Sequence, residues 1–380
     1  MLRFLLPALH IKMVLEMPTK SKRRKALQTL PPDLGDTMEA VIARIQKLPS
    51  SKAKLGMEVL MWLHLAYRPL QLDELQHALS VEAGQTELDP DDIPSQKVIL
   101  DSCLGLVILD EETRTIRFVH YTLEEYFRGH GDKHFPNGCK TAAEICLTYL
   151  NFGDLVPHCQ VKDELWTKME NFAFLKYAAL NWGYYVARQC DDTVRKLALK
   201  ILEPVDTPCP LQVLYGFLST DWYYHLTPVD YMPATNVATK FAGVHVAAYF
   251  GLVACLQCLC HTMYLAANMN DDKRRTPLSW AAEKGHKDVV QLLLARDDVD
   301  FNAQDSDGRT PLSWAAKNGH KGVVKLLLER DVDVNTKDSE YGQTPMSWAA
   351  AYGHKDVVQL LLARDVDVNT KDSKFGMTPL

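Results

Sequence analysis

The sequence lacks the motifs that mark the commonest enzyme classes. No G-x-x-x-x-G-K-[ST] phosphate loop occurs in its 380 residues, so the chain encodes no P-loop nucleotidase. The metalloprotease pattern H-E-x-x-H, the hydrolase pattern G-x-S-x-G and the protein-kinase signatures are absent as well. We therefore expect a protein that is not an enzyme and needs no cofactor.

An excess of charge of one sign is also lacking. The net charge is only −6, and acidic and basic residues nearly balance from Asp271 onward. No face is built for a phosphate backbone, so we expect no nucleic-acid partner. The basic cluster Lys20–Lys25 is interpreted as a solvated helix face, with a nuclear localisation signal or a phosphate-facing patch as the alternative.

Long apolar runs and a regular cysteine pattern are missing too. His10 and Lys12 interrupt the N-terminal run before it reaches signal-peptide length, and the run from Val244 to Cys260 is too short to span a membrane. The nine cysteines have irregular spacing, which indicates reduced thiols. We expect a cytoplasmic protein without membrane contact, with the nucleus as the alternative location.

What the chain does have is a near copy every 34 residues. RTPLSWAAEKGHKDVVQLLL begins at Arg275, RTPLSWAAKNGHKGVVKLLL at Arg309 and QTPMSWAAAYGHKDVVQLLL at Gln343. This period, with T-P-L, A-A, G-H and an L-L-L run, is typical of a two-helix repeat that stacks on its neighbours. The repeats resemble the ankyrin family.

The array occupies residues 241–380. Shifting Ala281-Ala282 back by one period lands on Ala247-Ala248, so the apolar run there is a worn first copy at 241–274. Three regular repeats follow at 275–308, 309–342 and 343–376, and 377–380 begins another. Because no polar capping helix follows, we expect a truncated product or a gene model cut short.

Three positions in each regular repeat predict local geometry. A threonine caps the first helix and precedes a proline that fits its first turn; a glycine ends that helix; and a histidine satisfies loose backbone groups. These are Thr276, Thr310 and Thr344, then Gly285, Gly319 and Gly353, then His286, His320 and His354. One histidine per repeat cannot converge on one ion, so we expect no metal site.

The thiols of Cys255, Cys258 and Cys260 fall, after a shift of one period, on Val289, Leu292 and Leu294. Those are apolar helix positions, so we interpret the cysteines as buried replacements for aliphatic residues rather than as a zinc or redox cluster.

The candidate partner-binding residues are those at which the repeats differ. They are Glu283-Lys284, Lys317-Asn318 and Ala351-Tyr352 before each Gly-His pair, and Asp307, Tyr341 and Phe375 at the loop tips. In the ankyrin fold, which the repeats resemble, such positions face the concave groove and its fingertips. We predict a protein partner there. Absence of constraint would give the same variation.

The region 37–130 predicts helices followed by a hairpin, the order of a winged helix. The expected elements are helices at Thr37–Leu48, Lys54–Ala66, Leu70–Glu82 and Val98–Leu104 and strands at Leu106–Leu109 and Thr115–Val119. We expect Asp36 and Asp73 to cap the first and third of these helices.

The hairpin runs into Phe118–Phe127, an F-x-H-x-T-x-x-E-[YF]-[YF] string. It resembles the end of the winged-helix domain in NACHT-type signalling ATPases, the NOD-like receptors of animals and their fungal relatives. Leu30–Leu34 and Arg68–Leu75 resemble the fungal branch, which makes residues 1–36 the tail of a NACHT-associated helical segment. The resemblance implies that His120 contacts ADP when a NACHT module is present. Alone, His120 is a hydrogen-bonding residue at a helix start.

Between the two regions, residues 139–236 are rich in aromatics and helix formers, and Phe174–Ala179 with Trp182 resembles the helical linker of fungal NACHT-ankyrin proteins. The expected fold is therefore mainly α: a winged helix, a helical linker and an ankyrin-repeat solenoid.

The resemblance implies the interaction and ligand-sensing part of a NACHT-ankyrin receptor, acting in non-self recognition and programmed cell-death signalling, with oligomers only as part of a full-length receptor. The alternative is a free-standing ankyrin adaptor or scaffold. A P-loop and an effector in the reading frame upstream of Met1 would favour the receptor.

We predict that the isolated chain shows no measurable affinity for ATP or ADP, because it has no phosphate loop to cradle them. Isothermal titration calorimetry with each nucleotide checks this, and tight binding would overturn the domain assignment.

Overall fold

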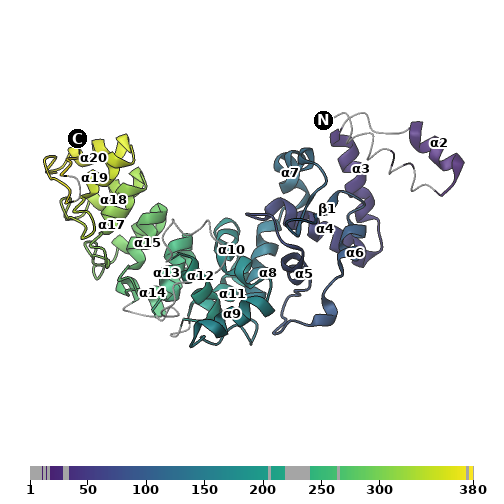
Figure 1. Ribbon diagram of the computed structural model, residues 1–380, viewed down its shortest axis with the longest axis horizontal. Coiled ribbons are helices and arrows are strands. Elements are labelled where there is room, and N and C mark those ends of the chain that lie inside the picture. Colours follow the sequence, from purple (N-terminus) through teal and green to yellow (C-terminus); the bar gives the residue numbers. More distant parts are fainter. Residues whose placement is uncertain are drawn as a thin grey trace. The chain divides into compact units, whose positions relative to one another are not determined.

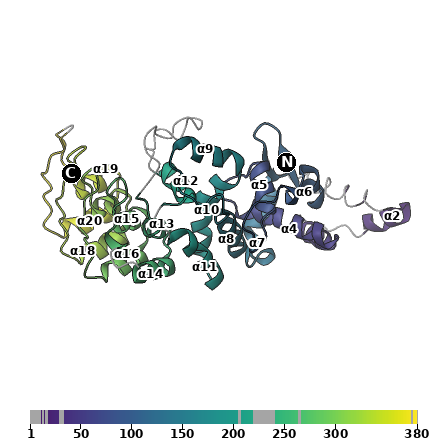
Figure 2. The same cartoon turned by 90° about the horizontal axis from the view of Figure 1, so that it is seen from below.

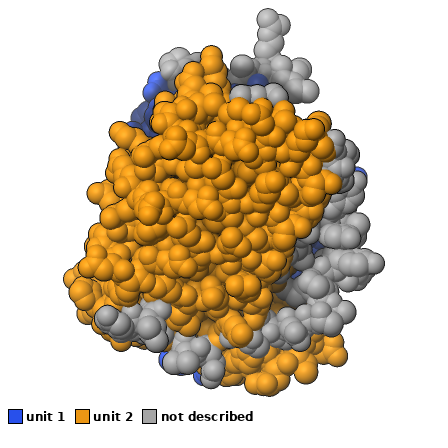
Figure 3. All heavy atoms as spheres, turned by 90° about the vertical axis from the view of Figure 1, so that its left-hand side faces the viewer, with its two compact units in different colours: residues 1–145, 172–174 blue, residues 146–171, 175–380 orange. Residues whose placement is uncertain are grey.

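The computed structural model describes residues 11, 14, 18–28, 34–203, 207–218, 240–262, 266–373 and 376–379. The candidate Phe375 and the Leu30–Asp33 part of the N-terminal motif lie outside these residues. The chain is mainly helical and forms two compact units (Figures 1 and 3). Unit 1 holds residues 1–145 and 172–174, and unit 2 holds residues 146–171 and 175–380.

Unit 1 is a winged helix with flanking helices. Its described elements are α2 (Lys20–Gln28), α3 (Leu34–Gln46), α4 (Ser50–Leu65), α5 (Leu72–Leu79), the 3-10 turn η1 (Pro90–Asp92), α6 (Gln96–Ser102), β1 (Val107–Asp110), β2 (Thr115–Phe118), α7 (Tyr121–His134) and the start of α8 (Gly138–Leu150). The strands pair antiparallel, with Val107 opposite Phe118. Helix α4 is central: it contacts α3, α5, α6, α7 and β2, and its Trp62 is fully buried.

Two helix starts differ from the sequence prediction. Helix α3 begins at Leu34 and α5 at Leu72, so Asp36 and Asp73 lie inside the first turns and not at the N-cap positions. At α5 the capping carboxylate is Glu74, which accepts the backbone N–H of Gln71 at 2.9 Å.

The carboxylate of Glu74 also accepts hydrogen bonds from the two terminal guanidinium nitrogens of Arg68, at 2.7 and 2.5 Å. Glu74 is only 5% exposed. A bidentate pair whose carboxylate is buried therefore sets this helix start, and the general preference for Asp at a cap does not.

Unit 2 contains the rest of α8 and the remaining helices. They are α9 (Lys162–Asn171), α10 (Leu175–Arg188), α11 (Asp192–Leu202), α12 (Cys209–Leu218), α13 (Gly243–Phe250), α14 (Val253–Thr262), η3 (Ala266–Asn268), α15 (Pro277–Lys284), α16 (Lys287–Leu294), α17 (Pro311–Lys317), α18 (Lys321–Leu328), α19 (Pro345–Ala351) and α20 (Lys355–Leu362). From α13 onward they form helix pairs. The first helices α13, α15, α17 and α19 stack in one layer and the second helices α14, α16, α18 and α20 in another (Figure 2). Helix α11 packs against both helices of the first pair.

The predicted local geometry of the repeats is confirmed. The hydroxyl of Thr276 accepts the N–H of Ser279 at 3.2 Å, with a proline at the start of the helix, and the same cap recurs at Thr310 and Thr344. Gly285 has a φ of 77°, and a Cβ there would lie 2.6 Å from Nδ1 of His320. Only glycine fits both the left-handed backbone and the histidine packed above it.

The histidines join each repeat to the one before it. Nε2 of His286 donates to the carbonyl of Tyr249 at 2.8 Å, Nε2 of His320 to that of Glu283 at 2.8 Å, and Nε2 of His354 to that of Lys317 at 2.9 Å. The prediction that these rings satisfy backbone groups is confirmed, and the bonds cross between repeats.

The first pair uses a different cap. Ala242 stands where the other repeats have threonine, and His245 stands where they have serine. The His245 ring is fully buried; Nδ1 accepts the N–H of Ala242 at 3.1 Å and Nε2 donates to the carbonyl of Met269 at 2.9 Å. Only the neutral ring can make both bonds. Burial lowers the pKa of His245, against a weaker attraction from Asp271.

We predict a pH-dependent stability that depends on His245. Because its pKa in the folded chain lies below the ordinary 6.5, the unfolded chain takes up the proton first as the pH falls. The contribution is complete above about pH 6.5 and decreases below it. The melting temperature should therefore fall between pH 7 and pH 5.

His77, His134 and His286 also have pKa values lowered by burial, so the wild-type slope combines several groups. The double variant Ala242→Thr/His245→Ser, which restores the cap of the other repeats, isolates His245. An unchanged pH slope in that variant would contradict the assignment.

Candidate partner-binding site

The tryptophans on the first helices of the regular repeats alternate with arginines that lie just before two of those helices. The guanidinium carbon of Arg275 lies 3.5 Å from the ring centre of Trp280 and 4.4 Å from that of Trp314. Arg309 lies 5.1 Å from Trp314 and 5.2 Å from Trp348. Each arginine thus sits between the indoles of two successive repeats, in a cation–π arrangement that contributes on the order of 1–2 kcal/mol when desolvated. We call these five side chains the Trp–Arg ladder.

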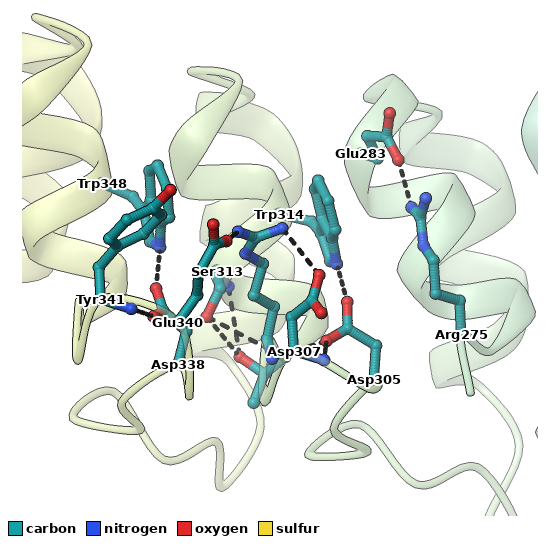
Figure 4. Close-up of polar contacts among 12 residues, drawn as sticks. Arg275, Glu283, Asp305, Asp307, Ser313, Trp314, Asp338, Glu340, Tyr341 and Trp348 are labelled. Carbon is teal, nitrogen blue, oxygen red and sulfur yellow. Dashed lines mark hydrogen bonds and ion pairs between the residues drawn. The ribbon is translucent and has the colours of Figure 1, made fainter. Parts of the chain in front are cut away.

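A carboxylate holds each indole of the ladder. The Nε1–H groups of Trp280, Trp314 and Trp348 donate to Asp271, Asp305 and Asp338 at 3.0, 2.9 and 2.8 Å. Figure 4 shows Trp314 and Trp348 on successive repeats, each with its nitrogen toward the aspartate below it.

The second oxygen of each aspartate binds its own loop. In the middle repeat, Oδ1 of Asp305 accepts the N–H groups of Asp307 and Arg309, both at 2.9 Å. One buried side chain therefore fixes the hairpin loop to the helix that follows it.

The ladder changes character at both ends. Phe241 occupies the position of the arginine in the first repeat and packs edge-on against Trp280, with ring centres 5.7 Å apart. Gln343 occupies that position in the last regular repeat. There the ring centre of Trp348 lies 6.4 Å from that of Tyr341 and 6.0 Å from that of Tyr352.

Glu283, a predicted partner-binding residue, already has a structural role. Its carboxylate pairs with Arg275 and with Lys284. Burial raises the pKa of Glu283, but the attraction of these two cations outweighs it and the pKa is lowered overall. The carboxylate of Glu283 is therefore already paired with an arginine of the Trp–Arg ladder.

Lys317 and Tyr352 form a cation–aromatic group on the candidate surface. The Lys317 ammonium lies 4.8 Å from the ring centre of Trp348, 5.3 Å from Trp314 and 6.0 Å from Tyr352. Tyr352 is 56% exposed. The structure thus brings together one cation and one exposed ring above a buried framework.

The remaining candidates on the helices are less distinctive. Lys284 lies 4.8 Å from the ring centre of Tyr249, while Asn318 and Ala351 are exposed. Asn318 donates to the carbonyl of Trp314 at 3.0 Å.

At the loop tips the 34-residue shift gives the wrong equivalence. It pairs Asp307 with Tyr341, but the side chain that shares Arg309 with Asp307 is Glu340, at 2.7 Å against 3.2 Å for Asp307. Likewise Asp338, and not Ser339, takes the place of Asp305 under the indole. One residue is lost earlier in the repeat, and Tyr341 is an extra residue at the tip. Aligning D-S-D-G with D-S-E-Y-G would have revealed it.

His120 lies in unit 1, apart from these residues in the sequence. It is the N-cap of α7, where Nδ1 accepts the N–H of Thr122 at 3.3 Å and lies 3.0 Å from the Thr122 hydroxyl. The structure therefore places it at a helix start. A pocket of about 270 Å³ in the same unit is lined by Leu63, His64, Ala66, Phe118, Glu124, Phe127 and Arg128, without His120.

Within the described residues, no group of three or more His, Cys, Asp or Glu side chains is arranged to hold a metal ion. Cys255 is buried, while Cys258 and Cys260 are partly exposed in α14. None of the helices that the structure describes is long and apolar enough to cross a membrane.

Comparison with known families gives two matches. The model described as ankyrin repeats (3 copies) matches residues 244–338 and 298–372. The model described as the winged helix domain of GPI inositol-deacylase matches residues 43–134. No curated protein matches the chain. The chain is therefore a winged-helix domain followed by ankyrin repeats, and the repeats imply protein partners.

We predict that Trp314 and Asp305 are energetically coupled. Trp314→Phe leaves the buried carboxylate without one donor, and Asp305→Asn weakens the loop bonds as well; each should lower the free energy of unfolding by about 1–3 kcal/mol. In the double variant the loss should be smaller than the sum by about 1 kcal/mol or more, because the shared bond is lost only once. Urea unfolding of the four proteins checks this, and additive losses would show that the bond contributes nothing.

Proposed function

We propose that the chain binds a protein partner through the surface formed by Lys317, Asn318, Ala351, Tyr352 and the loop tip at Asp307 and Tyr341. The observation that carries the proposal is a separation of roles. The arginines of the Trp–Arg ladder and the aspartates that hold its indoles are buried and Trp314 is partly exposed, and the indoles and aspartates recur in all three regular repeats, whereas the residues that differ lie beside them. An array built in this way can change its partner without changing its framework.

We further propose that this binding activity belongs to a NACHT-ankyrin signalling receptor, with a role in non-self recognition and programmed cell death. Two features support it: the winged-helix match at residues 43–134, and the Phe118–Phe127 motif at the end of that domain. In this proposal the chain is not an enzyme. His120 would contact a nucleotide only where a NACHT module accompanies it.

The contribution of single residues follows from their exposure. Tyr352 is 56% exposed and lies at the edge of the aromatic group, so its removal disturbs little of the fold. Exposed aromatic residues next to a cation are typical energetic centres of protein interfaces. Tyr352 and Lys317 are therefore the residues to change first.

We predict that a photo-crosslinking amino acid at position 352 captures a specific protein from cell extract, while the same group at Gln359, exposed on α20, does not. Tyr352→Ser together with Lys317→Ala should weaken binding of the captured protein at least tenfold. The melting temperature should change by only a few degrees.

The control is Tyr67→Ser, which removes a ring that is 46% exposed in the winged-helix unit. It should leave binding unchanged. Equal capture from positions 352 and 359, or parallel losses of binding and stability, would refute the assigned surface.

A further inference from the structure

Two buried thiols of unit 2 lie against each other. Cys159 is in the segment before α9, and Cys209 is the first residue of α12. Both side chains are fully buried, and the two thiol groups lie within hydrogen-bonding reach of each other. The two cysteines therefore approach closely although three helices separate them along the chain.

The fold holds this pair in place through Gln212, one turn after Cys209 on α12. Its Oε1 accepts the N–H of Cys159 at 2.9 Å, and its Nε2 donates to the carbonyl of Cys159 at 3.1 Å. Next to it, Nδ1 of His158 lies 2.8 Å from the carbonyl of Thr207. These bonds join the backbone around Cys159 to the start of α12 and to the residues just before it. They thereby hold the two cysteines close together.

The surroundings make the two thiols unequal. The hydrogen bond from Cys209, together with the ammonium group of Lys168 on α9, lowers the pKa of Cys159 despite its burial. The pKa of Cys209 is raised by the same hydrogen bond and by burial. Of the described cysteines whose pKa is shifted, Cys159 alone shifts downward, and the thiolate is the reactive form.

A metal site does not explain the pair, because no metal-binding group of three side chains occurs in the part of the chain that the structure describes. Thiol oxidation is the chemistry that two facing cysteines of unequal acidity support.

We propose that Cys159 and Cys209 form a redox site that closes to an intrachain disulfide when the protein meets hydrogen peroxide. The Cys159 thiolate attacks peroxide, forming an S–O bond as the O–O bond breaks; the hydroxide released takes up a proton and leaves as water. The Cys209 thiol then attacks the sulfenic acid, forming the S–S bond and releasing a second water. Two thiols are oxidised and one peroxide is reduced to two waters.

The disulfide links α12 to the segment before α9 and closes a loop that contains α9, α10 and α11. Helix α11 contacts α13 and α14, so the cross-link stiffens the helices on which the first repeat is packed. Oxidation would in this way rigidify the helices that support the first repeat.

The test treats the full chain with hydrogen peroxide and maps disulfides by mass spectrometry of non-reduced peptides. We expect a Cys159–Cys209 peptide, a melting temperature raised by several degrees, and reversal of both by dithiothreitol. In Cys209→Ser the sulfenic acid at Cys159 has no partner and should be trapped by dimedone. Cys103→Ser, which removes another buried thiol, should form the disulfide as the wild type does.

A second variant keeps the test decisive if Cys209→Ser does not fold. Lys168→Met removes the cation beside Cys159 from a partly exposed position, and it should slow disulfide formation several-fold at neutral pH, with a smaller difference at pH 9. Persistence of both thiols under peroxide, or pairing of either with another cysteine, would overturn the proposal. An oxidation rate unchanged in Lys168→Met would overturn the assigned role of Cys159 as the attacking thiol.

Discussion

The bond between a buried aspartate and the indole above it is the constraint on which the repeat array depends. Helices of seven or eight residues are too short to be stable alone, so each pair needs contacts that fix its loop and its neighbours. Asp305 supplies them from one side chain: one oxygen orders the loop, and the other orients Trp314 so that its faces meet the cations of two repeats. Burial raises the pKa of Asp305, and the hydrogen bonds that its carboxylate accepts offset part of that cost.

The arginines of the ladder solve a related problem. An arginine that is only 7–8% exposed would be destabilising in an apolar layer, yet its flat guanidinium fits between two indoles and keeps its edge for carboxylates. Arg275 lies between Trp280 and Trp314, and Arg309 lies between Trp314 and Trp348. The equivalent positions of the first repeat and the last regular repeat hold Phe241 and Gln343.

Sequence alone predicts the regular features well. The period, the threonine caps, the glycine turns and the hairpin of the winged helix depend on local rules that each segment satisfies by itself. Sequence alone does not predict a feature that depends on a contact with a residue elsewhere in the chain. Glu74 replaces Asp73 as the capping side chain because Arg68 pairs with it. Asp338, by contrast, lies out of period because one residue is lost earlier in the repeat, and a local alignment of the loops shows this. Of the candidate site, sequence identified the variable residues but could not show that Glu283 is paired with Arg275.

The histidine bonds between repeats have a consequence for how such an array can diversify. The carbonyls that accept them belong to Tyr249, Glu283 and Lys317, positions at which the side chain differs in every repeat. Because these hydrogen bonds use only main-chain carbonyls, a different side chain at these positions leaves the bonds between repeats intact. The histidine bonds therefore place no constraint on the side chain at these positions, and the constraints on two of them have another origin: the ring of Tyr249 is buried against Trp280, and Glu283 pairs with Arg275.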